Sequence, residues 1–371
     1  MFLLAPGFAQ DWQGEAEAEI YQELAGSQLE AIEGELARGL EQNLPGLSLG
    51  NLIRKNGAAI DLNLVDFLQY LWQLLWRELL ANVGLLGQLL ALGVLCALLS
   101  QLKTAFQKQD ALDLAFTVCY YCLLALALKS LVVAVGANRN AIAQMGTLLN
   151  AVVPVLSGLL VAGGAVSSAV ILEPAVLVGV TWLINIVQQL VLPLILGGVC
   201  LGALGNFTEG LSLSRLAKLM LQFATIALGL TFTIFMGLMA IKGVAAPLAD
   251  TVALRSAKFM VGSLIPILGK MLTDALEVVA SCSAAIRGAA GILSLVGVIV
   301  YCFVPILKAM ALVLIYRFAG AAIEPVADKR LADGLGWMAD GLLLLSLAVL
   351  SVGIMFFVGV AVMVKAANPW G

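Results

Sequence analysis

Long apolar runs separated by short polar segments make up most of this chain, and they predict membrane-spanning helices. From about residue 79 onward the runs reach the ~20 residues that a helix needs to cross a hydrocarbon core of about 30 Å. We expect six such helices, over 79–102, 111–136, 175–203, 219–244, 291–316 and 339–364. The predicted fold is an all-α, polytopic integral membrane protein whose multi-pass membrane domain covers 79–371.

Two further apolar stretches differ from these spans because proline and glycine interrupt them. They cover 145–170 and 259–286. Non-helical backbone is tolerated at membrane depth where protein or water covers it. We therefore expect a re-entrant or short hairpin in each stretch. A full crossing over 145–166 is the alternative, so the count of crossings lies between six and eight.

The N-terminal part is more polar than the rest of the chain. Met1–Ala9 is a short apolar stretch that ends in small residues, which indicates the remnant of a signal peptide. Residues 10–60 are largely polar and acidic, as expected of an exported segment, because acidic sequence is poorly retained beside anionic lipids. Residues 61–78 carry a polar stripe at helical spacing beside Trp72 and Trp76. This pattern predicts an amphipathic helix in the head-group plane, with the two tryptophans as interfacial anchors.

Composition narrows the classes of function. The chain is 62% hydrophobic and 12% charged and contains no histidine, so the commonest general base and metal ligand are missing. It has no P-loop motif for ATP hydrolysis. The net charge of −3 argues neither for nor against a nucleic-acid partner, and since no basic cluster suggests one, we expect none. Cys119 and Cys122 have CxxC spacing, but small buried hydrophobes explain cysteines in an apolar run better. We expect no enzyme activity, no cofactor and no metal site.

The distribution of basic residues predicts an orientation. Cytoplasmic loops carry an excess of lysine and arginine. With the N-terminal segment on the non-cytoplasmic side, six crossings place most of the basic loop residues in the cytoplasm. These residues are Lys103, Lys108, Arg215, Lys218, Arg317, Lys329 and Arg330. Arg139, Arg255 and Lys258 would face the other side.

Prolines recur at a fixed offset. Pro154 and Pro193 are followed 112 residues later by Pro266 and Pro305. At this offset the predicted span 111–136 falls on the predicted span 219–244, which indicates a parallel internal repeat. Transport folds are often built from repeats with broken helices. The alternative is that proline and glycine are simply common in membrane helices.

Charged residues within apolar segments are candidates for a conduit or a partner face. Lys129 and Lys308 lie within predicted spans, where a charge usually faces a bundle interior or water. Lys270, Asp274 and Glu277 follow one helix face in the second broken stretch. The four prolines above complete this candidate set. The alternatives are that the two lysines snorkel to the interface and that the second group forms a solvated face.

A pair of glycines predicts close helix packing. Gly198 and Gly202 are four residues apart, which places two small residues on one helix face. Such faces let membrane helices approach each other closely.

The order of these features resembles the stage III sporulation protein AE family of endospore-forming bacteria. The resemblance covers nearly the whole chain, including the helix over 61–78 and the run LLANVGLLGQLLALGVLCALLSQL that follows it. The stretch AKFMVGSLIPILGKMLTDALEVVASCSAAIRGAAG over 257–291 and the closing NPW over 368–370 are the most characteristic parts. None of these segments is a catalytic motif.

The resemblance implies a multi-pass protein of the mother-cell membrane that surrounds the forespore. Such a protein belongs to a channel or secretion-like complex needed for late forespore development. Its implied partners are sibling sporulation membrane proteins, a separate ATPase, forespore-side channel proteins and the lipid bilayer. Two alternatives stay open, namely an autonomous secondary transporter for a small solute and a non-conducting membrane scaffold.

Overall fold

The computed structural model describes residues 64–105, 110–162, 164–205, 213–264, 302–325 and 329–366. Within these residues the structure is helical. The helices are α3 (Leu64–Ala81), α4 (Val83–Ala105), α5 (Asp110–Ala162), α6 (Val166–Ile186), the π-helix η1 (Val187–Val191), α7 (Leu192–Gly205), α8 (Leu213–Leu264), the helix Cys302–Ile323 and α10 (Lys329–Ala366).

Six segments of the described chain are long and apolar enough to cross a membrane, and they correspond in order to the six predicted spans. The prediction of an all-helical, polytopic membrane protein is therefore confirmed. The segments are Val83–Leu102, Leu114–Val161, Val166–Gly205, Leu213–Asp250, Cys302–Ile323 and Lys329–Ala366.

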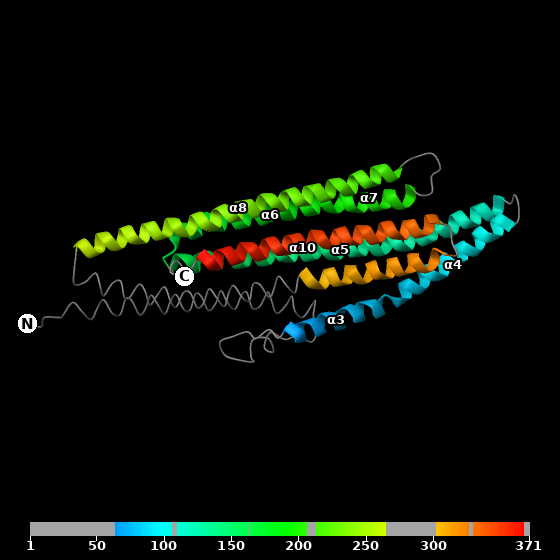
Figure 1. The fold of residues 1–371 in the computed structure, drawn as a ribbon, viewed down its shortest axis with the longest axis horizontal. Helices are drawn as coiled ribbons and strands as arrows, with labels where there is room; N and C mark the ends of the chain where they lie inside the picture. The colour runs from blue at the N-terminus through cyan, green and yellow to red at the C-terminus, as the bar shows by residue number, and fades with distance from the viewer. Residues whose placement is uncertain are drawn as a thin grey trace, which may run out of the picture.

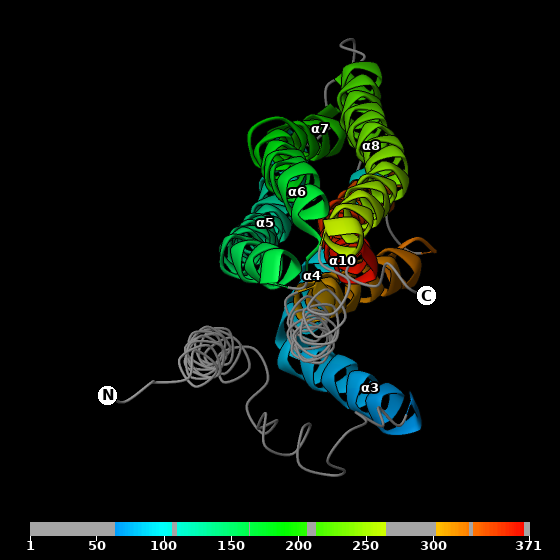
Figure 2. The same cartoon turned by 90° about the vertical axis from the view of Figure 1, so that its left-hand side faces the viewer.

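The bundle is elongated, with its long helices lying side by side (Figure 1). The helices α5, α8 and α10 run in one direction, and the continuous rod of α6, η1 and α7 runs in the other. Seen from its end, α10 lies between the α5–α6 side and α8 (Figure 2). It contacts α5, α6, α7 and α8, so it is a central element of the bundle.

The predicted hairpin over 145–170 is corrected by the structure. Residues 145–162 continue α5, which is 53 residues long and contains Pro154 in its interior. A proline removes one helical hydrogen bond, and neighbouring helices in a membrane protein can offset that loss. Buried Val152, Val153 and Leu156 anchor this part of α5 in the core, so the helix passes through the proline.

The chain reverses only after α5 ends. Gly164 has φ 81, a left-handed conformation that glycine adopts without steric cost, and α6 begins two residues later. Because the turn lies at Gly164, the third span begins at Val166 and not at the predicted residue 175. The other predicted hairpin, over 259–286, lies outside the described residues apart from the end of α8.

Two helices related by the predicted repeat have matching lengths and directions. These helices are α5, with 53 residues, and α8, with 52, and they run parallel to each other (Figure 1). Pro266 lies outside the described residues, so the correspondence of the four prolines stays a prediction.

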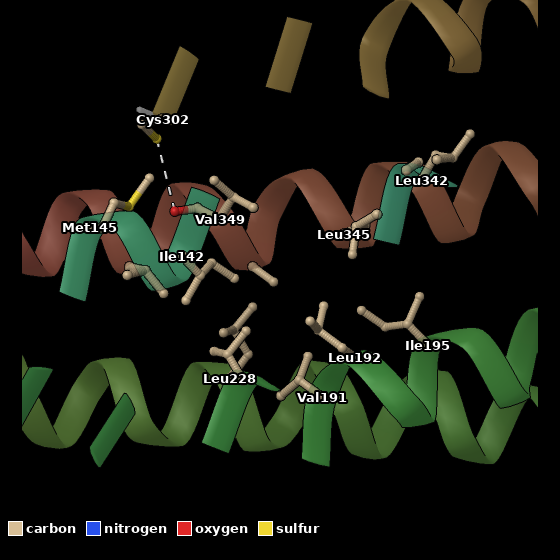
Figure 3. Packing of buried hydrophobic residues seen from close by; sticks show 14 of the residues in the cluster. Ile142, Met145, Val191, Leu192, Ile195, Leu228, Cys302, Leu342, Leu345 and Val349 are labelled. Carbon is tan, nitrogen blue, oxygen red and sulfur yellow. Dashed lines mark hydrogen bonds between the residues drawn. The ribbon is translucent and has the colours of Figure 1, made fainter. Parts of the chain in front are cut away.

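The core between the helices is mainly apolar. Figure 3 shows Ile142 and Met145 of α5 near Val349 of α10, with Val191 and Leu192 on the facing rod. All five side chains are buried. At this level the described helices are held together by close packing, which in a membrane replaces the hydrophobic effect as the main force between helices.

Candidate functional site

The helix Cys302–Ile323 makes polar side-chain contacts with three other helices, and this group of contacts is the candidate site. It links to α3 through Lys308, to α5 through Tyr316 and to α10 through Arg317. A polar side chain in an apolar segment is costly unless it is paired. Three such contacts on one span make this helix the best candidate for a functional element.

The first contact is an ion pair between Lys308 and Glu78. Lys308 Nζ lies 3.8 Å from Glu78 Oε1, and the two side chains are 48% and 20% exposed. Glu78 stands near the end of α3, where Asn82 bridges to α4 by donating from Nδ2 to the Glu78 carbonyl at 2.8 Å. The pair therefore fixes the α3–α4 junction against the start of the helix Cys302–Ile323.

The second contact is buried. Tyr316 is fully enclosed, and its hydroxyl donates to the Ala127 carbonyl at 3.1 Å. The same hydroxyl also pairs with the hydroxyl of Ser130. Ser130 Oγ lies 2.9 Å from the same carbonyl oxygen; while Tyr316 donates its single hydrogen to the carbonyl, Ser130 donates its own to the Tyr316 oxygen. These bonds join the last span but one to α5 and satisfy both hydroxyl groups inside the bundle.

The third contact was missed by the sequence analysis. Arg317 was assigned to a cytoplasmic loop, but the helix continues to Ile323 and places Arg317 within it. Arg317 Nη2 donates to Asp340 Oδ1 of α10 at 3.0 Å, and both side chains are more than half exposed. An apolar run ending at 316 gave no sign of this pairing, because the two partners are 23 residues apart in sequence.

The structure brings some of the predicted site residues together and not others. Pro305 is buried in the same helix as exposed Lys308. Lys129 is exposed on α5, next to the Ser130 that contacts Tyr316. These residues therefore gather around one helix.

The remaining predicted prolines lie elsewhere. Pro154 is exposed in the second half of α5, and Pro193 is exposed in α7, two residues after the π-helix. The structure does not bring them to the contacts of the helix Cys302–Ile323. The last four predicted residues, Pro266, Lys270, Asp274 and Glu277, lie outside the described residues.

Both predicted packing glycines lie against neighbouring helices. Gly198 faces Leu221 of α8, and a Cβ added there would lie 3.2 Å from the Ala217 carbonyl oxygen. Gly202 faces the indole ring of Trp337 in α10, which leaves no room for a side chain. The rod of α6, η1 and α7 thus approaches two helices closely at its α7 end.

The predicted anchors lie on the outer surface of α3. Trp72 and Trp76 are 60% and 49% exposed, and their rings meet edge to face with centroids 6.0 Å apart. Figures 1 and 2 show α3 extending away from the bundle on the N-terminal side of α4. Their position at the membrane interface stays a prediction.

A second polar level crosses the bundle at mid-length, and the sequence analysis noted only Arg139 there. Gln188, in the π-helix, donates from Nε2 to the Arg139 carbonyl of α5 at 3.4 Å. The adjacent Asn138 is buried, with Nδ2 donating to the Ala134 carbonyl at 2.9 Å. The sequence signal was the pair of polar clusters 138–140 and 185–189, each inside a long apolar segment.

The described residues offer no arrangement for metal chemistry. They contain no group of three or more histidine, cysteine, aspartate or glutamate side chains that could hold an ion. Cys119 is buried and donates to the Leu92 carbonyl at 3.6 Å, whereas Cys122 is exposed. The two cysteines of the CxxC spacing therefore lie in different surroundings. The contacts of the helix Cys302–Ile323 can hold α3, α5 and α10 in register with it.

Comparison with known proteins decides the family. The family model for stage III sporulation protein AE matches residues 47–367. The chain belongs to this family. The stage III sporulation protein AE of Bacillus subtilis (strain 168) is 32% identical over 325 residues, which cover 88% of this chain and 82% of that protein. No solved structure matches the chain.

Membership in the stage III sporulation protein AE family agrees with the fold. The family match includes α3 and the six candidate spans, so the family model covers the membrane domain. The chain is a multi-pass membrane protein of a sporulation family. Neither description names an enzymatic activity.

Proposed function

We propose that this chain is a non-enzymatic membrane subunit of a channel or secretion-like complex that links the mother cell with the forespore. It would reside in the mother-cell membrane around the forespore, with its N-terminal segment on the non-cytoplasmic side. Sibling sporulation membrane proteins and a separate ATPase would complete the complex. Family membership and the six candidate spans support this proposal.

One structural observation favours a subunit over an autonomous transporter. A secondary transporter needs polar groups that converge on a substrate site near the middle of the membrane. Within the described residues Lys129 and Lys308 are exposed, and the core side chains drawn in Figure 3 are apolar. Charged side chains on the outside of the bundle do not line an internal solute site.

The helix ends support the proposed orientation. The ends of α4 and α7 and the starts of α8 and α10 gather at one end of the bundle (Figure 1). Arg215 and Lys218 at the start of α8 are exposed there, as is Lys329 at the start of α10. By the tendency of basic loops to stay in the cytoplasm, this basic end would face the mother-cell cytoplasm.

Affinity purification from sporulating cells tests the assignment. The full chain would replace the endogenous relative in an endospore-forming host and carry a C-terminal tag. We expect late forespore gene expression to be retained and sibling membrane proteins to co-purify after mild crosslinking. A chain that supports sporulation yet purifies without any sibling protein would contradict membership of a complex.

A liposome assay separates the alternatives. Solute uptake by the purified chain alone would favour an autonomous transporter, which the proposal excludes. For a non-conducting scaffold, neutralising Lys270, Asp274 and Glu277 together should leave sporulation intact, whereas deletion of 10–42 should abolish assembly. Loss of sporulation with normal assembly in the neutralised variant would favour a part in the conduit.

A further inference from the structure

We propose that the lipid bilayer covers only one half of this bundle and ends at a polar girdle midway along the helices. The girdle consists of the exposed residues Arg139, Asn140, Asn185, Gln189 and Lys308. The covered half is the one next to the basic helix ends. The outer half, built from the far parts of α5, α6, α8 and α10, would stand outside the bilayer.

The helices α5 and α8 are too long to lie entirely within one bilayer. At 1.5 Å per residue, the 53 residues of α5 extend about 80 Å, and the 52 residues of α8 extend nearly as far. The hydrocarbon core is about 30 Å thick. Both helices run along the long axis of the bundle (Figure 1). Tilting them therefore cannot bring their whole length into the hydrocarbon core.

The two shorter spans identify the half that lipid covers. Val83–Leu102 has 20 residues and Cys302–Ile323 has 22, which is the length of a single crossing. Gly93 of the first lies directly against Ile323 of the second, and Tyr316 bonds to the Ala127 carbonyl in the first half of α5. Val83–Leu102 and the part of the second span after Lys308 therefore lie in the half that contains the basic ends. A bilayer around the outer half would leave these two spans almost entirely outside lipid, whereas a bilayer around the basic half leaves outside only parts of the long helices, with exposed Val170, Val178 and Val244.

Contacts between helices place the girdle residues at a common level. Gln188, the neighbour of Gln189, bonds to the Arg139 carbonyl, which joins the girdle residues of α5 to those of the rod. Cys302 lies 3.9 Å from the Val349 carbonyl, at the level of Ile142 (Figure 3). Lys308 follows six residues later, about 9 Å along the helix. The girdle thus extends across α5, the rod and the helix Cys302–Ile323.

Polar surface of this kind belongs at a head-group layer. Exposed arginine and amide side chains are costly in hydrocarbon and find hydrogen-bond partners among head groups and interfacial water. The ion pair of Lys308 with Glu78 lies at the same layer, where α3 leaves the bundle. The carbonyl and phosphate oxygens of lipids are the ligands that the girdle would meet.

Two groups of exposed charges in the covered half, Lys129 and the Arg317–Asp340 pair, can be accommodated there. Twenty residues counted from Leu114, where the apolar part of α5 begins, reach Val133. Lys129 then lies one helical turn inside the hydrocarbon edge, within reach of the interface for a snorkelling lysine. Arg317 and Asp340, nearer the basic end, neutralise each other at 3.0 Å. The outer half would extend about 35 Å from Arg139 to the end of α5.

Lipid photolabelling of the wild-type full chain tests this placement without any mutation. The purified protein would be reconstituted into phosphatidylcholine vesicles that contain a lipid with a photoactivatable group in its acyl chain. We expect labelled peptides from 114–133 and 216–230, and several-fold less label on 166–180 and 244–252. Equal labelling of both sets would overturn the proposal.

Matched cysteine probes give a second measurement. Each probe is a single cysteine that carries a fluorophore in a full-length, otherwise cysteine-free chain. The first pair is Val118→Cys in the covered half and Val178→Cys in the outer half, and the second pair, both on α8, is Leu219→Cys in the covered half and Leu248→Cys in the outer half. All four positions are exposed. Brominated acyl chains should quench the first of each pair several-fold more strongly. Equal quenching within both pairs, with normal helical content, would contradict the girdle as the lipid boundary. Neither experiment depends on partner proteins, so its failure would leave the proposed complex untouched.

Discussion

Asp250 of α8 caps the start of α6 through Ser167, which lies 83 residues earlier in the chain. The Ser167 backbone N–H donates to Asp250 Oδ1 at 2.7 Å, and the Ser168 N–H donates to Oδ2 at 3.0 Å. The first N–H groups of a helix have no partner within the helix, and an anion is favourable at that end. The carboxylate thus joins the α5–α6 turn to α8.

Replacement of Asp250 should weaken this junction. Asp250 is 1% exposed, so Asp250→Ala leaves two buried N–H groups without an acceptor. We expect the free energy of unfolding to fall by about 1–3 kcal/mol, with Asp250→Asn in between because it keeps one acceptor oxygen. Thermal unfolding in detergent, followed by circular dichroism, measures the change. Asp333→Asn at an exposed position of α10 is the control, and an equal loss in both aspartate-to-asparagine variants would argue against a capping role.

Two glycines on neighbouring helices should respond oppositely to the same substitution. A Cβ at Gly202 would overlap the indole ring of Trp337, whereas a Cβ at Gly229 of α8 meets nothing within 4 Å. We expect Gly202→Ala to cost about 1–3 kcal/mol through overpacking. Gly229→Ala should be neutral or add up to about 1 kcal/mol, because alanine is the better helix former. The same detergent unfolding assay ranks the two variants, and a stable Gly202→Ala protein would show that α7 and α10 can separate at little cost.

The ion pair between Arg317 and Asp340 makes a charge-reversal prediction. Arg317→Glu places two carboxylates together, and Asp340→Arg places two guanidinium groups together, in surroundings where lipid gives little screening. We expect either single variant to lower the amount of protein in the membrane several-fold. The double variant restores opposite charges and should recover most of that amount.

Immunoblots of membrane fractions and sporulation counts in a complemented host measure the effect of all three variants. Lys218→Glu, at an exposed basic end of α8, controls for a general effect of added negative charge. If the double variant is no better than the singles, the ion pair has no part in stability or assembly.

Sequence patterns predicted helix type and order well, because lipid imposes a simple rule on apolar runs. Each of the six predicted spans overlaps a long described helix. Their ends were less predictable. The polar residues 138–140 suggested the end of a span, but helical hydrogen bonds do not require apolar side chains, so α5 continues from 136 to Ala162.

The candidate site shows the same limit. Lys308 was singled out as a charge in an apolar run, and the structure adds its partner Glu78, 230 residues earlier in the chain. Tyr316 gave no sequence signal, since a buried tyrosine is common in helix cores. A single sequence shows which residues are unusual in lipid, whereas the partner of each depends on helix packing across distances of many residues.

The proposed orientation makes a labelling prediction with two matched positions. Asn140 is exposed in the girdle of α5, and Lys103 lies near the end of α4 at the basic end. In a cysteine-free chain expressed in intact cells, a membrane-impermeant maleimide should modify Asn140→Cys from outside. Lys103→Cys should react only after the membrane is permeabilised, because basic loops are retained in the cytoplasm. The reverse pattern would invert the topology, and it would place the outer half of the bundle on the cytoplasmic side.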